Sequence, residues 1–129
     1  MIILDTHVLY WLRIEPAKVS KPAVRKIEEA ERSGGVAVSV VTLLELANMI
    51  ERGKIVPRGT AERTIELLIE GIVVKPITPV IASLSIQFPA SFPRDPMDRV
   101  IAATARAEGL PLVTADSRIQ KCTLLQVVW

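Results

Sequence analysis

The sequence predicts an α/β fold in which helices cover both faces of a mainly parallel sheet. Short apolar runs rich in valine and isoleucine recur along the chain, as expected of strands that are buried on both faces. Amphipathic segments lie between them, and glycine, proline or a helix N-cap residue separates one element from the next. Strands that alternate with helices in this way favour a three-layer α/β/α sandwich.

In the first half of the chain, turn residues separate two apolar runs from three amphipathic segments. Ser20 is a good N-cap, and Pro22 suits the first turn of the helix that follows. Gly34 and Gly35 end that helix, and Thr42 opens the next one. The strands expected here are residues 2–4 and 36–40, and the expected helices are residues 6–13, 21–33 and 42–52.

The second half follows the same alternation. Gly71 and Gly109 each end a helix just before an apolar run. Thr78-Pro79 starts one helix, and Asp95-Pro96 has the arrangement of an N-cap followed by proline at the first helical position. The strands expected here are residues 72–74, 112–114 and 124–128, the expected helices are residues 60–70, 78–88 and 96–108, and residues 89–94 are expected to form a loop.

Composition limits the kind of protein. The chain has 129 residues, of which 50% are hydrophobic, so we expect one domain over residues 1–129 and exclude a disordered chain. A net charge of +2 neither demands nor forbids a nucleic-acid partner. One cysteine and one histidine exclude an internal disulfide and a Cys/His zinc site. No apolar run approaches the roughly 18 residues of a membrane helix, and we expect a cytoplasmic location.

Four acidic residues fall at one edge of the predicted sheet. Asp5 directly follows the first strand, and Asp116 lies two residues after the fourth. Glu45 and Asp98 lie in the first turns of helices that adjoin the second and fourth strands. Functional crevices of open α/β sheets lie beyond the carboxyl ends of the strands, so we expect these four side chains to meet there.

Each of these carboxylates also has a purely structural interpretation. Thr42 and Glu45 match a capping box, Asp98 complements the dipole of its helix, and the other two occupy turn positions. Asp95 is interpreted as an N-cap. Carboxylates about 4 Å apart, however, repel by about 4 kcal/mol at an effective dielectric constant of about 20. A divalent cation removes that conflict, and all-oxygen ligands favour Mg²⁺ or Mn²⁺, as in metal-dependent nucleases and phosphatases.

Four segments carry these acidic residues within longer motifs. They are residues 3–9 (ILDTHVL), 39–45 (SVVTLLE), 95–105 (DPMDRVIAATA) and 112–116 (LVTAD). In this order and at this spacing, across nearly the whole chain, they resemble the PIN-domain family, and in particular the VapC toxins of toxin–antitoxin pairs. The resemblance implies a PIN-like α/β/α sandwich that hydrolyses RNA with Mg²⁺ or Mn²⁺.

The resemblance also implies roles for individual residues. The catalytic residues, which are also the metal ligands, would be Asp5, Glu45, Asp98 and Asp116. Thr6 and Thr114 lie beside these positions and are expected to hydrogen-bond the ligands. Three arginines near the expected crevice, Arg94, Arg99 and Arg118, are expected to hold RNA phosphates. For a VapC-like toxin we further expect a homodimer, a cognate VapB-type antitoxin and no membrane partner.

Two other functions remain as alternatives. One is a catalytically inactive PIN-like scaffold that acts by binding protein or RNA. The other is a metal-dependent phosphatase or a receiver domain on a similar sheet. A phosphatase of this kind requires a second aspartate where His7 stands, and a receiver requires a lysine after the fourth strand. A receiver also requires a pair of aspartates near the start of the chain, and neither required pattern is evident, which favours the nuclease.

Overall fold

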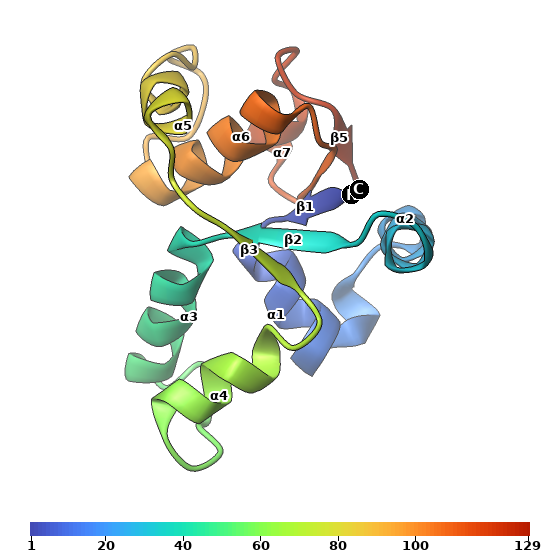
Figure 1. The fold of residues 1–129 in the computed structure, drawn as a ribbon, viewed down its shortest axis with the longest axis vertical. Helices are drawn as coiled ribbons and strands as arrows, with labels where there is room; N and C mark the ends of the chain where they lie inside the picture. Colours follow the sequence, from blue (N-terminus) through green and yellow to red (C-terminus); the bar gives the residue numbers. More distant parts are fainter.

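The computed structural model describes residues 1–129 and contains a five-stranded sheet with helices on both faces (Figure 1). The strands are β1 (Ile2–Leu4), β2 (Val36–Ser39), β3 (Val73–Lys75), β4 (Leu112–Val113) and β5 (Val127–Val128). The helices are α1 (Thr6–Ile14), α2 (Lys21–Arg32), α3 (Val41–Glu51), α4 (Ala61–Leu68), α5 (Pro79–Ser85), α6 (Pro96–Glu108) and α7 (Ser117–Gln120), with a 3₁₀ helix, η1, at Pro16–Lys18.

All five strands are parallel and lie in the order β3-β2-β1-β4-β5. The central strand, β1, pairs with β2 on one side and β4 on the other, so that Ile3 lies opposite both Ala37 and Leu112. The direction in which successive strands are added therefore reverses at β1. In sheets of this kind, ligands bind beside such a reversal, beyond the carboxyl ends of the strands.

The two faces of the sheet carry separate hydrophobic cores. Ile2 and Leu4 pack into a cluster that includes residues of α1, α2, α3 and α4, whereas Ile3 packs into a second cluster with residues of α5, α6 and α7. This division follows from the strand itself, because alternate side chains point to opposite faces. In Figure 1, α5 and α6 lie on one side of the sheet and α1, α3 and α4 on the other. The predicted three-layer α/β/α sandwich is confirmed.

The expected elements are present with small shifts of their ends, and the differences have local causes. The expected strand at residues 124–128 is reduced to β5, because a turn in which Leu125 N–H donates to the carbonyl of Cys122 precedes it. Both η1 and α7 went unpredicted, since one turn is too short to show a helical period. None of the helices has the length and apolar character needed to cross a bilayer.

Candidate active site

Asp5 is buried at the carboxyl end of the central strand, with only 8% of its surface exposed. Its backbone N–H donates to the carbonyl of Val113 on β4, and its Oδ2 accepts a 2.7 Å hydrogen bond from Thr114 Oγ1. Burial raises the pKa of the Asp5 carboxyl, and the Thr114 hydrogen bond acts against that rise. The sheet therefore fixes a costly charge at the point where strand addition reverses.

Glu45 is held on the other side of the site by a chain of hydroxyls. Thr6 Oγ1 donates to Glu45 Oε1 at 2.6 Å and lies 2.9 Å from Thr42 Oγ1. The capping-box interpretation is therefore wrong: α3 begins at Val41, no side chain caps it, and Thr42 is fully buried against α1. Burial raises the pKa of Glu45, with a further rise from the charges of nearby carboxylates.

Asp98 is half-buried in the first turn of α6 and interacts with every other member of the group. Its pKa is raised to about 7, chiefly by burial and then by the charges of four carboxylates: Asp5, Asp95, Glu45 and Asp116. Ile101, Ala102 and Ala105 follow it along the buried face of α6, which holds the helix against the second core. The structure thus brings the other three sequence-predicted carboxylates, Asp5, Glu45 and Asp116, within electrostatic reach of Asp98.

Asp116 differs from the others because its charge is already compensated. Its Oδ1 caps α7 by accepting the backbone N–H groups of Arg118 and Ile119 at 2.8 and 3.3 Å, and its Oδ2 accepts a 3.1 Å bond from Arg118 Nη2. Burial opposes ionisation, but the hydrogen bonds from Arg118 outweigh it and hold the pKa of Asp116 below its usual value. Its N–H also donates to Thr114 Oγ1, which ties it to the Asp5 side of the site.

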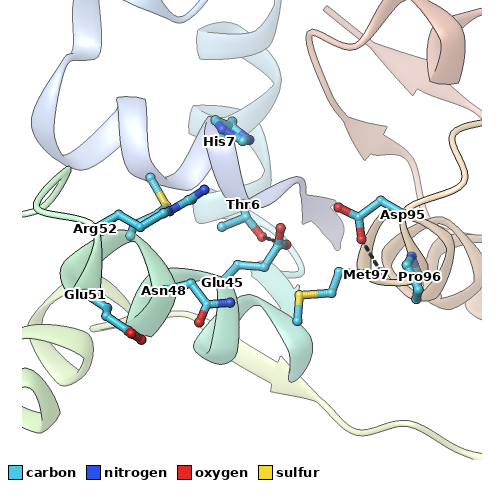
Figure 2. Close-up of a pocket in the computed structure, with 10 residues that line it drawn as sticks. Thr6, His7, Glu45, Asn48, Glu51, Arg52, Asp95, Pro96 and Met97 are labelled. Carbon is cyan, nitrogen blue, oxygen red and sulfur yellow. Dashed lines mark hydrogen bonds between the residues drawn. The ribbon is translucent and has the colours of Figure 1, made fainter.

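Asp95 is a fifth carboxylate of the group, and the sequence predicted it only as an N-cap. Its Oδ1 accepts the N–H of Met97 at 2.9 Å, which confirms the predicted N-cap. Carboxylate oxygens of Asp95, Asp98 and Glu45 nevertheless lie within 4.8 Å of one another. Figure 2 shows Asp95 and Glu45 turned toward the space between α6 and α3. The sequence signal was the three-residue spacing of Asp95 and Asp98, which places both at the start of one helix.

Two of the arginines that were expected to hold phosphates are engaged within the protein. Arg99 Nε donates to the carbonyl of Pro93 at 2.9 Å, and its guanidinium lies 5.9 Å from the centre of the Phe92 ring. Arg118 is paired with Asp116 at 3.1 Å. Arg94 is exposed. Arg99 therefore anchors the loop before α6, and Arg118 supports a member of the acidic group.

The chemistry of the donor set fits a divalent cation. The five carboxylates offer only hard oxygen donors. Burial raises the pKa of three of them, Asp5, Glu45 and Asp98, and none of these three forms a salt bridge. Carboxylates crowded in this way are stabilised by an ion of opposite charge, and Mg²⁺ and Mn²⁺ prefer such ligands. Two of the ligands are also oriented by buried threonine hydroxyls, as is usual around metal sites.

Comparison with known proteins identifies the class to which this fold and site belong. The sequence matches the PIN domain family over residues 2–123, and the chain belongs to that family. Ribonuclease VapC22 of Mycobacterium tuberculosis (strain ATCC 25618 / H37Rv) is 37% identical over 119 residues, which cover 92% of this chain and 89% of that protein. The predicted membership of the PIN-domain family, with its likeness to VapC proteins, is confirmed.

Solved structures share the fold over almost the full length. VapBC2 from Rickettsia felis, solved with a DNA fragment from its promoter, matches with a TM-score of 0.75 at 16% identity, over 98% of this chain and 97% of that one. A toxin–antitoxin complex from Klebsiella pneumoniae matches with a TM-score of 0.69 at 21% identity, over 100% of this chain and 97% of that one. At these identities the likeness establishes the fold.

Proposed function

We propose that this protein is a metal-dependent endoribonuclease and the toxin of a VapBC-type toxin–antitoxin system. The observation that supports the proposal is the acidic cluster beyond the carboxyl edge of the sheet, in which carboxylate oxygens of Glu45, Asp95 and Asp98 lie within 4.8 Å of one another and the charges of Asp5 and Asp116 also act on Asp98. The 37% identity to a protein named as a VapC ribonuclease supports the RNA substrate. A cytoplasmic location and a single domain over residues 1–129 accord with this function.

The proposed ligands of Mg²⁺ or Mn²⁺ are Asp5, Asp98, Asp116 and Glu45, with Asp5 and Asp98 as principal ligands. When bound, the ion supplies activation of water and neutralisation of charge on the phosphoryl group. The protein itself positions the carboxylates that would bind the ion. Thr114 aims Oδ2 of Asp5, Thr6 aims Oε1 of Glu45, and the packed face of α6 holds Asp98 near both. These groups are fixed before substrate binds, which lowers the reorganisation that the reaction requires.

Proteins of similar fold also indicate which protein partners to expect. The neighbours from Rickettsia felis and Klebsiella pneumoniae are toxin–antitoxin complexes, and we propose a VapB-type antitoxin and a homodimer for this chain. The structure also leaves large apolar side chains exposed, among them Val56, Val80 and Ile86. Exposed apolar surface of this kind is suited to burial against protein partners.

The test is cleavage of a mixed single-stranded RNA pool by the purified protein, with Mg²⁺, with Mn²⁺ and with EDTA. Asp98→Asn is run beside it, and Glu28→Gln serves as the matched control because it removes a carboxylate from the exposed face of α2. We expect metal-dependent cutting that falls at least about a hundredfold in Asp98→Asn and is unchanged in Glu28→Gln. Equal cutting by folded Asp98→Asn would overturn the proposal. No cutting together with no metal binding would favour the inactive scaffold, whereas metal binding without cutting would indicate a narrow RNA target that the pool lacks.

A further inference from the structure

One face of α3 continues the acidic site into an open cavity. Glu45, Asn48 and Arg52 are spaced by three and four residues and therefore share that face. They line a cavity of about 540 Å³ together with His7 of α1 and the residues at the start of α6 (Figure 2). Ligand-binding cavities commonly measure about 300–1,000 Å³, so this one is large enough for a nucleotide.

Arg52 is a free cation beside this cavity. Unlike Arg118, it has no carboxylate within 4.0 Å, and unlike Arg99 it donates no hydrogen bond to the backbone. It is exposed at the end of α3, yet near enough to Glu45 for its charge to favour that carboxylate's ionised form. Figure 2 shows its side chain extending over α3 toward His7. An arginine in this state is available to a ligand.

The polar groups of the cavity suit a nucleotide. A carboxamide such as that of Asn48 offers both donors and an acceptor, as the edge of a base requires. His7 is exposed, and its ring lies 6.1 Å from the ring of Trp11. An exposed aromatic ring of this kind offers a surface on which a base stacks. Only two of the ten lining residues, Met49 and Met97, are hydrophobic. The cavity therefore offers little apolar surface against which an apolar peptide side chain could be buried.

We propose that this cavity binds the nucleotide next to the scissile phosphate, with Arg52 holding its phosphate and Asn48 and His7 contacting its base. The inference rests on the proposed ribonuclease function. An RNA strand carries one negative charge per nucleotide, so a phosphate adjoining the cleavage site would otherwise be repelled by the carboxylates. Arg52 lies on the α3 side of those carboxylates and offsets that repulsion. Asn48 and His7 are then the groups that set base preference.

The test of the phosphate contact is RNA binding, measured by fluorescence anisotropy over a range of salt concentrations. All variants carry Asp98→Asn so that the RNA stays intact. We expect Arg52→Ala to weaken binding about tenfold and to reduce the slope of log K against log salt by about 0.7, the value for one single-strand phosphate contact. Arg52→Lys, which retains the positive charge, is expected to leave the slope of log K against log salt unchanged. Arg25→Ala, which removes an exposed arginine from α2, leaves both affinity and slope unchanged.

The test of the base contacts is the cleavage pattern of a randomised RNA pool by protein with an intact acidic site. We expect Asn48→Ala to flatten the preference at one position beside the cut and to leave Mn²⁺ affinity unchanged. An unaltered salt slope in Arg52→Ala, or an unaltered preference in Asn48→Ala, overturns the inference while the ribonuclease function stands. Failure of the wild-type protein to bind or cut any RNA overturns the ribonuclease function itself.

Discussion

Thr114 Oγ1 donates a 2.7 Å hydrogen bond to Oδ2 of Asp5 although 109 positions separate the two residues in the chain. The bond exists because β4 is inserted beside β1, which aligns the residues that follow the two strands. The same hydroxyl oxygen accepts the N–H of Asp116. One buried side chain therefore connects two members of the acidic group, and the sheet order rather than the local sequence creates the connection.

We expect Thr114→Val to damage the site without changing its shape. Valine has nearly the volume of threonine but cannot donate to Asp5 or accept from Asp116. Loss of a donor to a buried carboxylate lowers the free energy of unfolding by about 1–3 kcal/mol, measured by urea denaturation. Mn²⁺ affinity, measured by calorimetry, falls about 10–100-fold. Thr114→Ser keeps the hydroxyl and serves as the control; equal losses in both variants would contradict the role given to the hydrogen bond.

A pair of substitutions at Asp95 separates its two roles. Asn caps a helix as well as Asp does, whereas Ala does not, so Asp95→Ala lowers the free energy of unfolding by about 1 kcal/mol and Asp95→Asn does not. Both variants remove a charge that raises the pKa of Asp98. Both variants are expected to weaken Mn²⁺ binding equally, because neither Asn nor Ala supplies a carboxylate beside Glu45 and Asp98. A normal Mn²⁺ affinity in Asp95→Asn would leave capping as the sole role of this side chain.

Removal of metal is expected to abolish activity and to leave the fold intact. The two hydrophobic clusters lie on the faces of the sheet, and neither contains a carboxylate of the site. Far-UV circular dichroism in EDTA should therefore match that of the metal-loaded protein. Addition of Mn²⁺ at 100 times its Kd should raise the free energy of unfolding by about 2.7 kcal/mol. Asp98→Asn should lose this gain, and loss of helical signal in EDTA would indicate a structural ion.

The sequence was sufficient where a local pattern decides the structure. The predicted N-caps Ser20 and Asp95 each accept the expected backbone N–H group. The sequence was insufficient where a contact between residues far apart in the chain decides the structure. Thr42 fits a capping box by spacing, but its hydroxyl lies against Thr6 instead. Local sequence does not show which of two available partners a side chain takes, because the answer depends on how α1 and α3 pack.

The same limit applies to the site. Spacing along parallel strands indicated that Asp5 and Asp116 would lie at one edge, since the sheet geometry is regular. It did not show that Arg99 and Arg118 bond within the protein, because long side chains reach partners in several directions. Nor did it show that Asp95 faces the acidic group with the carboxylate that caps α6.

The metal-free protein is expected to lose stability as pH rises through the neutral range. In the folded chain the pKa of Asp98 is raised from 3.8 to about 7, and those of Asp5 and Glu45 are raised as well. Between these values the folded state binds more protons than the unfolded state, so the free energy of unfolding falls with increasing pH. In EDTA, the Tm should therefore be higher at about pH 5.5 than at about pH 8. Asp98→Asn should flatten this slope and raise the Tm at the higher pH, whereas Glu28→Gln should leave it unchanged. A Tm that rises with pH in the metal-free wild type would contradict the proposed crowding of carboxylates.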